Sequence, residues 1–151
     1  MDGLKIENYL RRDKKCSVMF LGVFASDRLP TRVHRNRPSI LVCNTDRYGQ
    51  PGIHWIVIYI ESPSYGEFFD SFGRQPDIPF RTFLHKNCSS WQYNTGRQIQ
   101  SISSRFCGHY CIFYSLHRAR NYSVNAICNM FTRDTGLNDF LVHRFVCSLY
   151  Q

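Results

Sequence analysis

The sequence predicts one α+β domain over residues 1–151, in which helices flank a central mixed sheet. Residues 53–60 (IHWIVIYI) are apolar at both odd and even positions, which is typical of a central strand buried on both faces. Residues 107–120 (CGHYCIFYSLHRAR) are apolar nearly all round, as expected for a helix at the centre of a fold. A chain of 151 residues can bury a core of its own, and no linker divides it.

Before the central strand, the pattern predicts a short amphipathic helix over residues 4–10 and a strand over residues 18–24. Residues 27–38 contain two prolines and four arginines, which indicates an extended surface loop. Residues 39–45 (SILVCNT) have the composition of a buried strand, and residues 46–52 (DRYGQPG) that of a turn. This half of the sheet therefore comes early in the chain.

After the central strand, residues 67–71 (EFFDS) predict a short strand that pairs with it as in a hairpin. Residues 79–85 favour one or two helical turns. Residues 97–102 (RQIQSI) alternate between polar and apolar, which predicts an edge strand.

Two more helices are expected towards the C-terminus. Ser123 can cap a helix over residues 124–133, and a last helix is predicted over residues 138–150. The apolar side of this last helix is expected to consist of Phe140, Leu141, Phe145, Val146 and Leu149.

The chain is basic, with a formal net charge of +8. The basic residues gather in three places, at Arg11, Arg12, Lys14 and Lys15, at Arg32, Arg35 and Arg37, and at Arg118 and Arg120. Such clusters indicate either a solvated basic surface or contact with nucleic acid or an acidic partner. No apolar run is long enough to span a bilayer, and the first residues lack the apolar core of a secretory signal. We therefore expect an intracellular protein without a membrane partner.

Seven cysteines are present, an odd number that favours free thiols over a disulfide framework. Most are expected to be small buried side chains. Cys107 and Cys111 share one helix face and His117 follows, but the chain has no C-x2-C pair of the kind that zinc sites use. We therefore predict no metal site. Neither a P-loop nor a GxGxxG motif is present, which argues against nucleotide chemistry.

A cysteine protease needs a thiolate, an imidazole base and an oxyanion donor. Cys107 and His54 could supply the first two, and Asp70 could orient the histidine. Cys107 stands at the start of the strongest helix, where free amides and the helix dipole favour a thiolate. Gly108 beside it would permit close approach of a substrate backbone. His54 opens the central strand, and Asp70 follows at the end of the next strand, where its carboxylate could orient the histidine. Taken singly, each also fits a structural role: a buried cysteine, a core histidine and a turn aspartate.

Longer motifs around these residues resemble a known family. GIHWIVIYIESP, FFDSFG and SSRFCGHYCIFY are similar to the three active-site segments of the adenovirus proteinase (adenain) family of cysteine peptidases. CSVMFLGVFASDRLP and LVCNT resemble its N-terminal third, so the resemblance covers most of the chain in order.

The related Ulp-type proteases share the order of the active-site residues. In adenain the oxyanion glutamine stands seven residues before the cysteine, which here is Gln100; in the Ulp type it stands six before, which here is Ser101. This spacing favours adenain over the Ulp type as the family that the chain resembles. It also favours Gln100 over Gln98 as the oxyanion donor. Asp70, however, replaces the glutamate that adenain usually has, and it matches the aspartate of the Ulp type.

The resemblance implies a papain-like cysteine protease fold with permuted order, the histidine preceding the cysteine. It implies a cysteine endopeptidase that cleaves capsid or core precursors of a virus or virus-like element after small residues, glycine among them. It also implies stimulation by DNA and by a short capsid peptide, and, for a viral enzyme, a location in the host nucleus and the virion. The alternatives are a Ulp-like isopeptidase of a ubiquitin-like modifier and a non-catalytic basic nucleic-acid-binding relative.

The resemblance also singles out Cys88, because adenovirus enzymes hold their activating peptide by a disulfide to a cysteine upstream of the oxyanion glutamine. Cys88 lies in a polar stretch, KNCSSWQYN. We therefore expect it to be more exposed than Cys43, Cys111 and Cys147, and open to disulfide exchange. The alternative is an incidental loop cysteine.

Overall fold

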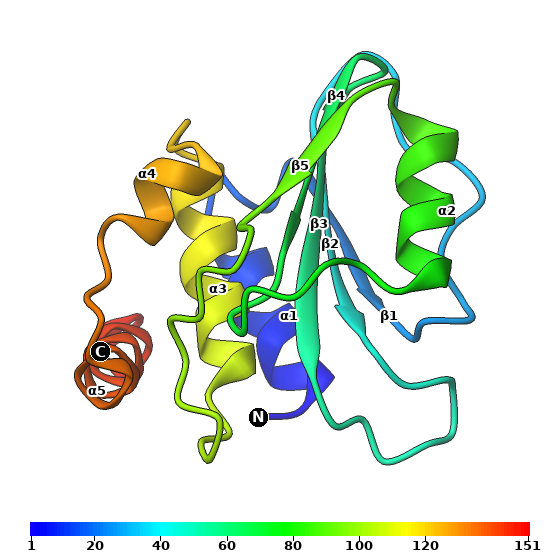
Figure 1. Cartoon of the computed structure of the whole chain (residues 1–151). Helices are drawn as coiled ribbons and strands as arrows, with labels where there is room; N and C mark the ends of the chain where they lie inside the picture. Colours follow the sequence, from blue (N-terminus) through cyan, green and yellow to red (C-terminus); the bar gives the residue numbers. More distant parts are fainter.

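A five-stranded mixed sheet forms the centre of the computed structural model, which describes residues 1–151 (Figure 1). Its strands lie in the order in which the chain makes them, and only the outer pairs, β1–β2 and β4–β5, are parallel. They are β1 (Phe20–Phe24), β2 (Ser39–Asn44), β3 (Trp55–Ser62), β4 (Tyr65–Phe69) and β5 (Trp91–Tyr93). The predicted α+β class and the hairpin-like pairing of β3 with β4 are confirmed.

Both faces of β3 are buried, as its apolar sequence predicted. Ile56, Ile58 and Ile60 belong to a core shared with α2 (Ile78–Asn87) on one face. Val57 and Tyr59 point the other way, into the larger core beneath the remaining helices. The alternation follows from the two-residue period of a strand. Figure 1 shows α2 alone on one side of the sheet and the other helices on the opposite side.

Helix α3 (Cys107–Arg118) lies against the middle of the sheet, with α1 (Gly3–Arg12) beside it. The ring of Tyr114 stacks on Phe69 of β4 with 4.5 Å between centroids. Most of α3 is buried, as expected for a central helix. Its first residue, Cys107, is thereby held at one end of the sheet.

The two C-terminal helices, α4 (Val124–Cys128) and α5 (Thr135–Ser148), depart from the predicted pattern. Ser123 caps α4 as expected, but the helix ends at Cys128. In α5, Phe140 and Leu141 are 59% and 45% exposed, so the predicted apolar side is wrong at these two positions.

Polar contacts set the rotation of α5 instead. Asn138 and Asp139 are buried. The amide of Asn138 donates to the carbonyl of Ile99, and the Tyr110 hydroxyl donates to Asp139 at 2.8 Å. Because these bonds face the core, Phe140 turns outward. None of the helices combines the length and the apolar character needed to cross a membrane.

Residues 97–102 do not form the predicted edge strand, which is β5 instead. Gly96 has a φ of +63°, and the chain turns there before running back beside the end of β4. The backbone amides of Ile99 and Gln100 both donate to the carbonyl of Ser71, at 2.9 and 3.2 Å. This irregular course buries Gln100 at a hollow that Cys107, the first residue of α3, also lines.

Candidate active site

His54 and Asp70 meet at one end of the neighbouring strands β3 and β4. His54 directly precedes β3 and Asp70 directly follows β4. Because the two strands are antiparallel, with Val57 opposite Phe69, both residues emerge at the same end. The Nε2 atom of His54 lies 2.6 Å from Oδ1 of Asp70, and the residues are 8% and 4% exposed. The sequence prediction that these two side chains come together is thus confirmed.

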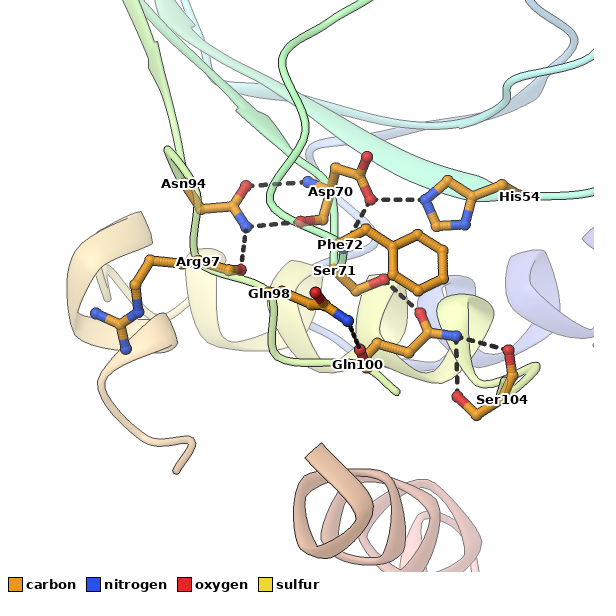
Figure 2. A network of polar contacts seen from close by, with 9 residues as sticks. All are labelled: His54, Asp70, Ser71, Phe72, Asn94, Arg97, Gln98, Gln100 and Ser104. Atoms are coloured by element: carbon orange, nitrogen blue, oxygen red, sulfur yellow. Dashed lines mark hydrogen bonds and ion pairs between the residues drawn. The ribbon is translucent and has the colours of Figure 1, made fainter. Parts of the chain in front are cut away.

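The carboxylate and backbone of Asp70 are held from two further sides (Figure 2). The backbone amide of Phe72 donates to the same Oδ1 at 2.9 Å. The Asn94 side chain accepts from the Asp70 amide at 3.1 Å and donates to its carbonyl at 2.6 Å. The Phe72 ring stacks on His54 with 4.7 Å between centroids. Asp70 and the imidazole plane are therefore fixed before any substrate binds.

Cys107 completes the group as the first residue of α3. Burial alone would raise the pKa of its thiol, but His54 and the backbone amides of Trp55 and Gly108 outweigh burial and lower it. For His54, burial alone would lower the pKa, whereas the bond to Asp70 and the interaction with Cys107 raise it to about 9. Between these two pKa values the thiolate–imidazolium pair is the favoured state.

The other buried cysteines show the opposite behaviour. Burial raises the pKa of Cys16 to about 12 and that of Cys128 to about 11. It raises the pKa values of Cys43, Cys88 and Cys111 as well. At Cys16 and Cys128 a nearby arginine acts against burial, but burial outweighs it. Cys107 is thus distinguished by its bonds to His54 and to backbone amides, and not by its exposure.

Gln100 is 1% exposed and lies in a polar network at the same cleft. Its Nε2 donates to the backbone oxygen and to the hydroxyl of Ser104, both at 3.1 Å. Its Oε1 accepts from the Ser71 hydroxyl at 2.5 Å. Gln98 is exposed, and its side chain only reaches back to the Gln100 carbonyl. The structure therefore places Gln100 at the cleft and leaves Gln98 outside it.

One hollow of about 630 Å³ contains His54, Gln100 and Cys107 on its walls. Apolar residues, two serines and two arginines line most of the rest, and no carboxylate does. These further wall residues include Ile53, Trp55, Phe72, Arg74, Ile102 and Arg105. A thiol of lowered pKa, an oriented imidazole and an amide donor around one cleft can together perform acyl transfer.

Cys88 is not the exposed thiol that its polar neighbours suggested. It is 5% exposed, and its Sγ donates to the Leu84 carbonyl at 3.2 Å. As the C-cap residue that follows α2, it turns inward against β4, where a Cβ on Gly66 would lie 2.8 Å from its sulfur. The exposed cysteine is Cys147. A disulfide from Cys88 to an activating peptide stays a prediction of the resemblance, and it would require this thiol to be uncovered.

Gly108 also serves the packing of two helices. A Cβ at this position would lie 3.2 Å from Ile6 Cδ1 and 3.3 Å from Met1 Cβ. The missing side chain thus lets α1 pack closely on α3. Met1 also lines the cleft at Cys107, and close approach of a substrate backbone at Gly108 stays a prediction.

Asn94 and Ser71 were not found by sequence reasoning. Neither stands in a pattern that marks a site on its own, although Ser71 lies inside the FFDSFG segment. Asn94 reaches the site through β5, which was not predicted, and this explains why it was missed.

Neither protein-family models nor curated proteins match the chain. Among solved structures, it is similar to the crystal structure of the ASFV pS273R protease, with a TM-score of 0.65 and 18% identity, over 94% of this chain and 66% of that one. A selenomethionine crystal structure of the same protease matches with a TM-score of 0.52 and 22% identity. This match covers 71% of this chain and 43% of the protease chain. The chain thus spans just under two thirds of the length of this protease. The likeness shows the fold alone and leaves the adenain subtype open.

Proposed function

We propose that the chain is a cysteine endopeptidase in which Cys107 is the nucleophile, His54 the base and Asp70 the residue that orients His54. The observation that carries this proposal is the lowered pKa of Cys107 at a cleft that also contains His54, itself bonded to Asp70. The likeness to a solved viral protease supports it at the level of the fold.

In the proposed reaction, the Cys107 thiolate attacks the scissile carbonyl carbon, and the carbonyl oxygen becomes an oxyanion. Gln100 and the free backbone amides at the start of α3 stabilise this charge. His54 then gives its proton to the leaving amine, which leaves an acyl group on the cysteine. Water, deprotonated by His54, then adds to the acyl carbon, and the bond from carbon to sulfur breaks. This releases the acid and restores the thiolate–imidazolium pair. The Asp70 carboxylate stabilises the imidazolium through its contact with His54.

For the substrate, we propose precursor proteins of a virus or virus-like particle, cut after small residues. The motifs and the glutamine spacing that resemble adenain support this choice. Asp70 favours a second candidate, a Ulp-like isopeptidase, because that type has aspartate at this position. Peptide substrates and isopeptide conjugates offered side by side would separate the two.

Replacing Gln100 by alanine tests the proposed site. Loss of one oxyanion donor is expected to lower kcat by about a hundredfold to a thousandfold, with little change in KM. Gln98→Ala is the matched control, because that amide lies outside the cleft, and it should keep the wild-type kcat. Steady-state kinetics on a peptide substrate measure both. If only Gln98→Ala lowers kcat, the assignment of the oxyanion donor is wrong.

We also propose that the protein binds DNA without sequence preference. Arg32, Arg35 and Lys86 line a second hollow of about 540 Å³ in which no wall residue is acidic. The hollow reaches Ile60 and Pro63 and so lies at the opposite end of β3 from His54. A ligand there would leave the cleft at Cys107 free.

Affinity for duplex DNA should fall steeply with added salt, because each neutralised phosphate releases counterions. Changing both Arg32 and Arg35 to glutamine should reduce the slope of log K against log salt by about 1.8, at about 0.9 per contact. Fluorescence anisotropy over a salt series measures the slope. An affinity that does not depend on salt would remove DNA as a partner.

A further inference from the structure

Two consecutive residues at the end of β4 serve the two halves of the candidate site. Asp70 faces His54, and Ser71 faces Gln100 (Figure 2). We propose that Ser71 is a positioning residue that fixes the side-chain amide of Gln100 with its donor towards the oxyanion. The inference rests on the proposed role of Gln100, and it names the residue through which the fold sets that role.

The hydrogen bonds leave one orientation for the Gln100 amide. The backbone oxygen of Ser104 can only accept, so the atom 3.1 Å from it must be the Nε2 donor. The other end of the amide is then Oε1, which can only accept. The Ser71 hydroxyl, 2.5 Å away, must donate to it. The Ser104 carbonyl thereby distinguishes the two ends of the amide. Ser71 supplies the donor that holds the buried Oε1 end in place.

Ser71 anchors the backbone of this segment as well. Its carbonyl accepts from the amides of Ile99 and Gln100. Ser71 and Gln100 are each 1% exposed, so water cannot readily replace these bonds. Both the main chain and the side chain of Gln100 are thus hydrogen-bonded to Ser71. Ser71 directly follows Asp70 in the chain, and Asp70 bonds to His54.

The two ends of the amide differ in how easily they can change partner. Nε2 bonds partly to the Ser104 hydroxyl, a rotatable group on a partly exposed residue, and an oxyanion can take its place. The bond from Ser71 to Oε1 needs no change during the reaction. A donor oriented in advance stabilises developing charge without the cost of reorganisation. Without Ser71, the buried Oε1 atom has no donor, and the Gln100 amide is held only by the bonds from Nε2 to Ser104.

Ser71→Ala is therefore expected to lower kcat at least about tenfold, with little effect on KM. The loss should not exceed the ~10²- to 10³-fold loss expected for Gln100→Ala. The matched control is Ser115→Ala, the same change at a fully buried serine whose hydroxyl has no partner. It should keep the wild-type kcat. Ser71→Ala added to Gln100→Ala should cause no further loss, because Ser71 acts through Gln100. Equal losses in both serine variants, or additive losses in the double variant, would overturn the inference.

Two further measurements separate this inference from the proposed function. The side-chain amide resonances of Gln100, assigned by their absence in Gln100→Ala, should shift and lose protection in Ser71→Ala. If they change while the wild-type protein cleaves no peptide, the positioning is supported and the peptidase proposal fails. If they stay unchanged in Ser71→Ala, Ser71 does not position Gln100.

If Ser71→Ala fails to fold, Ser71→Cys serves in its place, because a thiol keeps a weak donor. It should lower kcat less than Gln100→Ala does. An equal loss in the two variants would contradict the inference.

Discussion

Cys107→Ser is expected to reduce kcat for peptide cleavage on the order of 10⁶-fold, the loss typical of removing a nucleophile that acts as a unit with its base. The exchange barely alters the shape of the side chain. A hydroxyl, however, ionises at far higher pH than a thiol, so His54 cannot hold it as an anion. Steady-state kinetics on the purified variant measure the loss, and thermal unfolding should show an unchanged midpoint.

Cys147→Ser is the matched control, because it makes the same exchange at the exposed cysteine. It should cleave peptides at the wild-type rate. Turnover that persists in Cys107→Ser, or that disappears in Cys147→Ser, would show that Cys107 is not the nucleophile.

Asp70→Asn is expected to lower kcat by about 10⁴-fold. Asparagine keeps the shape of the side chain but removes the charge that stabilises the His54 imidazolium. The pKa of His54, about 9 in the wild-type protein, should therefore fall. In the wild type, kcat/KM should rise as Cys107 deprotonates at a pKa below its ordinary value and decline as the pH passes about 9. In the variant, the decline should begin at lower pH.

Asp77→Asn is the control for this change, because Asp77 is exposed and makes no side-chain bond at the start of α2. Its pH profile should match that of the wild type. An Asp70→Asn protein with wild-type kcat and an unmoved alkaline limit would remove Asp70 from the site.

Local sequence patterns were sufficient for the elements whose burial follows from their own residues. The apolar run of β3 and the all-round apolar surface of α3 were predicted in place, and both are buried as expected. They carry or adjoin His54 and Cys107, so the core of the candidate site follows from them. Asp70 was placed by the turn that reverses the chain between β3 and β4.

Elements that depend on distant polar contacts were not predictable in this way. Residues 97–102 alternate as a strand does, yet their amides bond to Ser71, nearly thirty positions away in the chain. The rotation of α5 depends on Asn138, which bonds to Ile99, 39 residues earlier. Cys88 looked exposed because its neighbours are polar, whereas the end of α2 turns it inward. The first two contacts join segments that no local pattern relates, whereas Cys88 is buried by a bond to Leu84, four residues earlier.

The central claim is that Cys107 is a thiolate because His54 holds it so, and the relative alkylation rates of two cysteines test this most directly. Cys107 is 7% exposed, whereas Cys147 is an exposed thiol. At about pH 6.5, where an ordinary thiol is almost fully protonated, iodoacetamide followed by mass mapping should modify Cys107 first. His54→Ala should abolish that preference. Labelling of Cys147 ahead of Cys107 in the wild-type protein, with no change in His54→Ala, would contradict the account.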